Sequence, residues 1–321
     1  MKALLCKQYG PPDSLVVEEI APLKAEQGQI VIDVKACGVN FPDTLIIQGK
    51  YQFKPPFPFS PGGEVAGVVK EIGEGVGHLK AGDDVFAMTG WGGFAQEVVV
   101  AANRAFPMPQ GMDYAVAASL MYTYGTSYHA LKDRANLQAG ETLLVLGAAG
   151  GVGLAALNLG KIMGAKVIAA ASTADKLALC KEYGADECIN YTQEDLKERL
   201  KALGGVDVIY DPVGGEYAEP ALRSMNWKGR YLVVGFAAGQ IPNIPLNLPL
   251  LKGCAVMGVF WGAFAEREPK ANYQNVMELL QFYQNGQMKP HIQRTFSLEE
   301  APQALYDMLE RRVMGKLVVT P

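Results

Sequence analysis

The stretch LLVLGAAGGVG, residues 143–153, predicts a buried strand that turns sharply through small residues into a helix. Residues 154–164 continue the helix and residues 166–172 predict the next strand, which makes a βαβ unit. A helix start presents unpaired backbone N–H groups and the positive end of the helix dipole, so it binds anions. Ala148 takes the place of the first glycine in the common G-x-G-x-x-G pattern, and a merely tight turn is the alternative. The context favours a dinucleotide site, whose phosphates we expect on Gly150, Gly151, Val152 and Gly153.

Length and charge exclude several classes of protein. The 321 residues suggest about two domains at ~150 residues each, and an apolar fraction of 49% is enough for a sizeable core. A net charge of −4 gives no footprint for nucleic acid or for an anionic membrane. The longest apolar region, residues 143–172, is interrupted by glycines and lysines, and the first ten residues do not form a signal peptide. We expect a soluble cytoplasmic protein that binds neither nucleic acid nor membrane.

Cysteine and histidine are few and scattered. The chain has five cysteines and three histidines, with no C-x-x-C pair and no spacing typical of zinc ligands. We expect reduced thiols, as in a cytosolic protein, and no metal site.

The first third of the chain differs from the middle. Residues 30–36, 64–72 and 94–100 predict short strands between Gly- and Pro-rich turns, which suggests a partly open β-barrel or sandwich. Helices are predicted from about residue 113. From residue 141 to about 260 strands and helices alternate, which predicts a doubly wound parallel sheet.

The C-terminal elements extend a parallel sheet poorly. They include a predicted helix over 273–285 and a predicted strand over 316–319, and we expect them to return to the first domain. The expected domains are therefore residues 1–123, 124–262 and 263–321, the last belonging with the first.

The end of the second strand of the βαβ unit indicates NADPH rather than NADH. NAD sites usually place Asp or Glu about 20 residues past the glycines, where the carboxylate bonds the ribose 2′-hydroxyl. This strand ends in Ser172 instead, which can donate a hydrogen bond to a 2′-phosphate, and Lys176 can supply a positive charge. Asp175 is a counter-indication, and an ordinary solvated helix lysine is the alternative for Lys176.

The loops after the later strands should cover the rest of the cofactor, because ligands bind at the carboxyl ends of strands in such sheets. By position these loops contain Gly214, Phe236, Phe260 and Trp261. For the glycine, a simple turn requirement is the alternative.

Five motifs carry a resemblance to a known family: residues 37–43 (CGVNFPD), 61–67 (PGGEVAG), 128–131 (YHAL), 140–153 and 211–215 (DPVGG). Over its whole length the chain resembles the medium-chain dehydrogenase/reductase superfamily, and within it the zinc-free NADPH:quinone reductase branch of the zeta-crystallin type. One position departs from the branch signature, since Asn158 stands where it has Gln. The resemblance implies an α/β protein with a GroES-like β-barrel catalytic domain and a Rossmann doubly wound parallel-sheet domain.

The positions that hold catalytic zinc in alcohol dehydrogenases of this superfamily are changed. The resemblance places Asn40, Gly63 and Tyr122 where those enzymes have Cys, His and Cys, and the cysteine cluster of their structural zinc is absent after Trp91. Thiolates and imidazoles hold such a zinc, so we expect none here. Alkoxide stabilisation then has no obvious source, and alcohol dehydrogenase activity is disfavoured.

The resemblance also implies roles for individual side chains. The nicotinamide would lie between the domains, near Asn40, Thr126 and the Phe260–Trp261 loop, and Tyr191 would reach the 2′-phosphate. Asn40 can orient a carboxamide or an acceptor oxygen, or it can simply form a turn. Tyr51 matches the proton donor of zinc-free enoyl thioester reductases, although quinone reductases carry a tyrosine here too. Shaping an apolar acceptor pocket is the other role open to Tyr51.

Three functions remain open from the sequence. Tyr51 and Asn40 are the candidate catalytic residues. The first hypothesis is hydride transfer from NADPH to a quinone without a metal, with the protons supplied by solvent. The second is NADPH-dependent reduction of the C=C bond of an enal, enone or enoyl thioester, which needs a proton at the α-carbon. The third is a non-catalytic NADPH-binding protein, as the use of this family as lens crystallin suggests. The family commonly forms homodimers through Rossmann edge strands, here the strand expected over residues 255–261.

Overall fold

The computed structural model describes residues 1–321 and contains two compact units. Unit 1 comprises Met1–Tyr122 and Pro290–Pro321, and unit 2 comprises Thr123–Lys289. None of the helices combines the length and the hydropathy needed to cross a membrane.

Unit 1 is built on a largely antiparallel sheet of seven strands. The order is β14-β15-β3-β4-β5-β7, and β6 pairs with β3. The alternating pattern of β3 puts Ile30, Ile32 and Val34 into one apolar core. The elements are β1 (Lys2–Leu5), β2 (Val16–Glu19), β3 (Gln29–Val39), α1 (Phe41–Ile46), β4 (Glu64–Ile72), β5 (Asp84–Met88), β6 (Glu97–Ala101), β7 (Ala105–Pro107), α2 (Tyr114–Ala117), β14 (Ile292–Ser297), α11 (Ala301–Leu309) and β15 (Lys316–Thr320).

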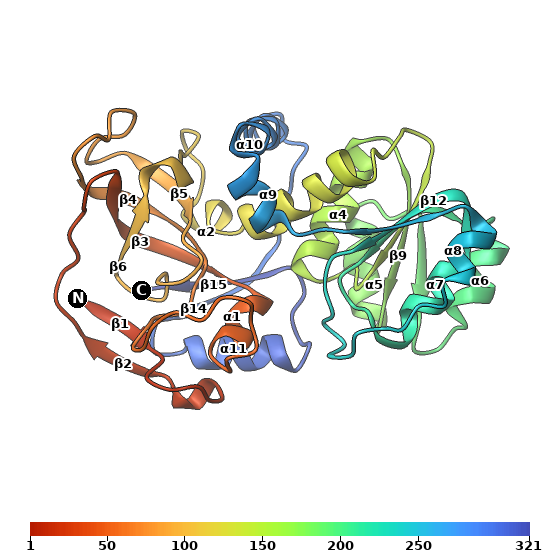
Figure 1. Ribbon diagram of the computed structural model, residues 1–321, viewed down its shortest axis with the longest axis horizontal. Helices are drawn as coiled ribbons and strands as arrows, with labels where there is room; N and C mark the ends of the chain where they lie inside the picture. Colours follow the sequence, from red (N-terminus) through yellow and green to blue (C-terminus); the bar gives the residue numbers. More distant parts are fainter. The chain divides into compact units, whose positions relative to one another are not determined.

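The C-terminal strand completes this sheet. β15 pairs antiparallel with β3, with Leu317 opposite Val39 and Val319 opposite Cys37. In Figure 1 the C-terminal strand β15 accordingly lies beside β3, although the two are far apart in sequence. This pairing places Lys316 next to the end of β3, where α1 begins.

Unit 2 is a doubly wound sheet of six strands. The order is β10-β9-β8-β11-β12-β13 and every neighbouring pair is parallel, which is the Rossmann arrangement and confirms the predicted fold class. The elements are α3 (Thr126–Tyr128), β8 (Thr142–Leu146), α4 (Gly151–Ile162), β9 (Lys166–Ala171), α5 (Ala174–Glu182), β10 (Glu187–Asn190), α6 (Leu196–Ala202), β11 (Val206–Asp211), α7 (Ala218–Arg223), β12 (Met225–Val233), α8 (Asn247–Lys252), β13 (Ala255–Gly258), α9 (Trp261–Arg267) and α10 (Pro269–Gln284).

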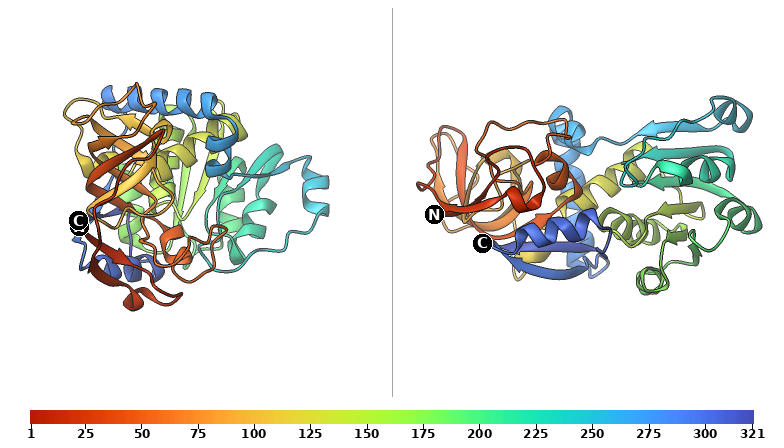
Figure 2. Two further views of the ribbon diagram at one scale, coloured as in Figure 1. Left: turned by 60° about the vertical axis from the view of Figure 1, so that its left-hand side comes forward. Right: turned by 90° about the horizontal axis from the view of Figure 1, so that it is seen from below.

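Two segments differ from the sequence-based expectation. The helix that the sequence predicts over residues 124–133 is largely π-helical, over Met121–Gly125 and His129–Arg134, with α3 between these two segments. The strand expected over residues 255–261 ends at Gly258, and α9 begins at Trp261. β13 is the last strand on its side of the sheet, and α8 protrudes beside this edge of unit 2 (Figure 2).

The predicted boundary at residue 263 is wrong. The structure keeps the chain in unit 2 up to Lys289, and only Pro290–Pro321 joins unit 1. The side chains of α10 bind within unit 2: Glu278 accepts a hydrogen bond from Lys132 at 2.5 Å, Asn275 donates one to Asp133 at 2.7 Å, and the Phe282 ring packs on that of Tyr128. An amphipathic pattern predicts that a helix buries one face, but it does not indicate which domain that face packs against.

Candidate functional site

The glycine turn of unit 2 opens α4 as a phosphate-binding turn would. Gly147 has a φ of +58°, in the left-handed region that favours glycine. A Cβ atom at Gly153 would lie 2.3 Å from the carbonyl oxygen of Gly147, so only glycine fits. No side chain caps α4, and the N–H groups of its first residues, Gly151, Val152 and Gly153, have no partner within the helix. These donors fit the pyrophosphate of a dinucleotide.

The residues beneath this turn are tied to the sheet. Ser127 donates a hydrogen bond to the carbonyl oxygen of Val152 at 3.0 Å and shares another with the hydroxyl of Tyr210 at 2.9 Å. Thr126, predicted near the nicotinamide, precedes this serine and is half-buried.

The three residues predicted at the 2′-phosphate come from neighbouring strand ends. β9 and β10 pair so that Asn190 lies opposite Ala171, which places Ser172 and Tyr191 at one edge of the sheet. Thr173 caps α5 by accepting a hydrogen bond from the N–H of Lys176 at 3.3 Å, and the lysine side chain is half-buried. No acidic side chain ends β9, as the sequence indicates.

A residue missed in the sequence adjoins this group. The ring of Tyr217 packs on that of Tyr191, with 4.3 Å between the ring centroids. Tyr217 follows β11 in a short 3₁₀ turn, Gly215–Tyr217, and no local motif marks it.

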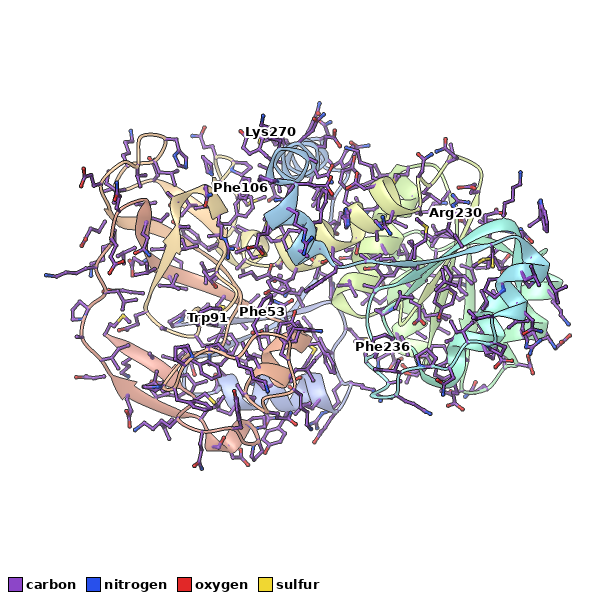
Figure 3. The ribbon with its side chains drawn as sticks, viewed as in Figure 1. Phe53, Trp91, Phe106, Arg230, Phe236 and Lys270 are labelled. Carbon is purple, nitrogen blue, oxygen red and sulfur yellow. The ribbon has the colours of Figure 1, made fainter.

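The loops after β11 and β12 contact one another. A Cβ atom at Gly214 would lie 2.9 Å from Cδ1 of Phe236, so the glycine permits the contact. Phe236, labelled in Figure 3, lies in the loop after β12 and is 36% exposed.

Phe260 and Trp261 differ in their surroundings. Phe260 is half-exposed, whereas Trp261 is 4% exposed and its indole N–H donates to Asn272 at 3.1 Å. The ring of Trp261 also fills the space beside Gly125. The structure therefore gives Trp261 a packing role within unit 2, and contact of either residue with a cofactor stays a prediction.

Unit 1 contains a buried polar cluster at the end of β3. The ammonium of Lys316 donates to Glu64 at 2.6 Å, to Asn40 at 2.8 Å and to the carbonyl oxygen of Val39 at 3.0 Å. The Asn40 amide donates to Glu64 at 3.0 Å and to the carbonyl oxygen of Gly38 at 3.2 Å. Both donors of Asn40 are thus used inside unit 1, which favours a role in holding this cluster together. Its predicted contact with nicotinamide or acceptor stays a prediction.

A second carboxylate, Asp43, lies beside this cluster. Its oxygens accept hydrogen bonds from the N–H of Asn40 at 2.7 Å and from the N–H of Gly62 at 3.0 Å. Burial raises the pKa of Asp43 to about 7, although the two backbone donors and Lys316 favour the charged form. This raised pKa was not predictable from the sequence, because the composition of the CGVNFPD motif does not reveal burial.

The three positions that would hold zinc in alcohol dehydrogenases come together in unit 1. A Cβ atom at Gly63 would lie 2.5 Å from the hydroxyl oxygen of Tyr122, so the phenol occupies the space that an imidazole at residue 63 would need. The N–H of Tyr122 donates to Glu64 at 3.0 Å. No group of three or more His, Cys, Asp or Glu side chains is arranged to bind a metal ion.

Tyr51 is a half-buried phenol near this cluster. Its ring packs against that of Phe53, with centroids 5.8 Å apart, and its hydroxyl has no hydrogen-bond partner in the protein. Burial, followed by the nearby charge of Asp43, raises the pKa of Tyr51. Phe53, labelled in Figure 3, and Phe57 are 51% and 43% exposed. Tyr51 is thus a hydrogen-bond donor beside partly exposed aromatic rings.

Comparison with known proteins agrees with this geometry. Residues 26–110 match the family "Alcohol dehydrogenase GroES-like domain" and residues 151–281 match the family "Zinc-binding dehydrogenase". The quinone oxidoreductase-like protein 2 homolog of Nematostella vectensis is 39% identical over 99% of this chain and 88% of its own length. The quinone oxidoreductase of Rattus norvegicus is 33% identical over 99% of this chain and 97% of its own length. The solved structure of Escherichia coli quinone oxidoreductase complexed with NADPH has a TM-score of 0.94 and 30% identity, and the match covers all of both chains.

Proposed function

Because the chain belongs to the medium-chain dehydrogenase/reductase superfamily, in its quinone oxidoreductase branch, we propose that it reduces a quinone with NADPH and without a metal ion. That it is an NADPH-dependent oxidoreductase follows from these relatives. Beyond this, we propose that the acceptor is a quinone and that the individual residues have the roles given below.

The observation that carries the proposal is the place of Tyr122 beside Gly63, where the resemblance puts the zinc ligands of alcohol dehydrogenases. A Cβ at Gly63 would lie 2.5 Å from the Tyr122 hydroxyl, so an imidazole there would displace the phenol, and Asn40 offers only an amide. A hydride acceptor that needs no Lewis acid fits these residues best. A quinone meets this requirement because its reduction product is an aromatic ring, and its protons can come from solvent.

Bound NADPH supplies the hydride in this proposal. The N–H groups of Gly151, Val152 and Gly153 bind its pyrophosphate, with Gly150 allowing close approach of the backbone. Ser172, Lys176 and Tyr191 bind the 2′-phosphate through a hydroxyl, an ammonium and a phenol. Gly214 and Phe236 belong to the loops that cover the cofactor.

A second candidate, reduction of an activated C=C bond, is favoured by the unpartnered hydroxyl of Tyr51. Such a reduction needs a proton at the α-carbon, and a phenol without an internal partner is able to donate one. The relatives named above are quinone oxidoreductases, which is why the quinone comes first.

Replacing Tyr51 by Phe separates the two candidates. Turnover of a quinone is expected to stay within about threefold of wild type, because no enzyme proton is required, whereas turnover of an enone would fall by about 100-fold or more. Tyr9→Phe is the matched control, since Tyr9 is a 41% exposed phenol that packs on Phe57. If Tyr51→Phe loses quinone turnover while Tyr9→Phe keeps it, the proposal that solvent protonates the reduced quinone is refuted. NADPH binding without turnover of either class would leave the non-catalytic binding protein.

We further propose that a second copy of the chain covers the β13 edge of unit 2. β13 pairs only with β12, and Val256 on it is 43% exposed. Leu246, Leu250 and Leu251 around α8 are 82%, 78% and 70% exposed. An apolar patch beside an open strand edge is typical of a homodimer interface. Leu250→Glu should convert the dimer to a monomer in light scattering, and a monomeric wild-type protein would exclude the interface.

A further inference from the structure

Asp211, at the end of β11, is a buried carboxylate with no role in the site described so far. Its side chain is 2% exposed and one oxygen, Oδ1, accepts hydrogen bonds from the N–H groups of Val213 and Gly214, each at 2.8 Å. The other oxygen, Oδ2, accepts a short hydrogen bond from the hydroxyl of Tyr231 on β12. No lysine or arginine pairs with it. A buried carboxylate without a cation is costly, so its three donors must hold it firmly.

The backbone around Asp211 joins two loops into one body. The carbonyl oxygen of Asp211 accepts from the N–H of Val234 at 2.9 Å and, more weakly, from that of Gly235 at 3.3 Å. Pro212 and Val213 then accept from the N–H groups of Ala237 and Ala238, at 3.0 and 2.8 Å. The loop after β11 and the loop after β12 are therefore fixed to each other by consecutive hydrogen bonds that begin at Asp211.

This body lies directly on the phosphate-binding turn. A Cβ atom at Gly147 would be 2.8 Å from Cγ2 of Val213, so the Val213 side chain lies close against the backbone of the turn, where only a glycine leaves room for it. Within the two loops, a Cβ atom at Gly215 would be 2.9 Å from Cβ of Ala238, so these loops are also closely packed on each other.

We propose that Asp211 and Tyr231 are positioning residues that hold both loops against the turn at Gly147 and thereby set the affinity for NADPH, without touching it. The inference rests on the NADPH site proposed above. Asp211 holds the first loop through its carboxylate and the second through its backbone carbonyl oxygen, and Tyr231 holds the carboxylate in place.

The test compares Asp211→Asn and Tyr231→Phe with a control on the same strand. Asp207→Asn is the control, because Asp207 at the other end of β11 also bridges strands, accepting from Thr142 at 2.8 Å and from Asn226 at 3.0 Å. NADPH affinity is measured by fluorescence titration, stability by the thermal midpoint, and kcat at saturating NADPH.

Asp211→Asn is expected to raise the Kd for NADPH about tenfold and Tyr231→Phe about fivefold, with kcat within about twofold of wild type. The double variant should be no weaker than about tenfold, because both changes break one unit. Asp207→Asn should lower the midpoint and leave the Kd unchanged. If Asp211→Asn does not fold, Tyr231→Phe carries the test, since it removes a single hydroxyl.

The proposal is overturned if Asp211→Asn or Tyr231→Phe lowers the midpoint as Asp207→Asn does and leaves the Kd for NADPH at the wild-type value. A wild-type protein that fails to bind NADPH would instead refute the cofactor site itself. A wild-type protein that binds NADPH but ignores quinones would refute only the proposed acceptor.

Discussion

Two buried carboxylates, Glu64 in unit 1 and Asp211 in unit 2, are held by different kinds of partner. Glu64 forms an ion pair with Lys316 at 2.6 Å, with side chains only 1% and 5% exposed. Asp211 accepts hydrogen bonds from neutral donors alone, from Tyr231 and from two N–H groups of its own loop. Lys316 lies 252 residues from Glu64 along the chain, whereas the backbone donors of Asp211 are its close neighbours.

The two kinds of partner imply that the two charges stabilise different parts of the protein. An ion pair that joins distant segments supports the whole unit, because removing one partner leaves an uncompensated charge in the interior. A carboxylate that caps its own loop acts locally, so its loss changes loop geometry first. We therefore expect charge removal in unit 1 to lower the free energy of unfolding and charge removal in unit 2 to weaken NADPH binding.

Lys316→Met should give the largest effect. It leaves Glu64 charged, buried and without a cation, so the free energy of unfolding should fall by about 3–5 kcal/mol in urea titrations. Lys2→Met is the control, because its ion pair with Glu299 is half-exposed and should contribute less than about 1 kcal/mol. Adding Glu64→Gln to Lys316→Met should recover part of the loss. An effect of Lys316→Met no larger than that of Lys2→Met would contradict the comparison.

Asp43→Asn should change how the stability of unit 1 depends on pH. Burial raises the pKa of Asp43 in the folded protein to about 7 from 3.8, so between about pH 4 and pH 7 the folded state holds a proton that the unfolded state has released. Wild type should therefore lose stability relative to Asp43→Asn as the pH rises through this window, by up to about 4 kcal/mol. Unfolding midpoints of both proteins across the window check this. A constant difference would show that Asp43 is ionised throughout.

Substituting two glycines of the turn should distinguish an effect on the stability of unit 2 from an effect on NADPH binding. Gly153→Ala places a Cβ 2.3 Å from the carbonyl oxygen of Gly147, so stability should fall by about 1–3 kcal/mol and NADPH affinity with it. At Gly150 the nearest atom would be 3.4 Å away, so Gly150→Ala should fold normally and weaken NADPH binding alone. Thermal midpoints and titrations distinguish the two. Equal destabilisation by both variants would count against this account of the turn.

Lys176→Ala should have the smallest effect. The ammonium of the half-buried Lys176 is expected to contribute about 1 kcal/mol to NADPH binding, roughly fivefold in Kd, and nothing to NADH binding. Lys181→Ala, at the exposed end of α5, is the control. If Lys176→Ala weakens the binding of NADPH and NADH equally, the lysine does not contact the 2′-phosphate.

Local features of the site were predictable from the sequence. The glycine turn, the missing acid before Ser172 and the alternation that builds the parallel sheet each depend on residues within about one βαβ unit of one another. Lys316 gave no such signal, because a lone lysine near a C-terminus is ordinary. Its significance comes from the register of β15 on β3. Tyr217 was missed for the same reason, since only the packing of two loops brings it onto Tyr191.

The two kinds of domain, the phosphate-binding turn and the changed residues at the metal positions were thus all predictable from the amino-acid sequence. Hydrophobic period and turn chemistry are local properties of a chain, and each can be recognised without knowing what packs against it. Three features became visible only in the tertiary structure. They are the ion pair of Glu64 with Lys316, the hydrogen bonds of Asp211 to two loops, and the return of the chain to unit 1 only after Lys289. Each depends on which distant segments meet and in which register, and burial then gives the charges there their strength.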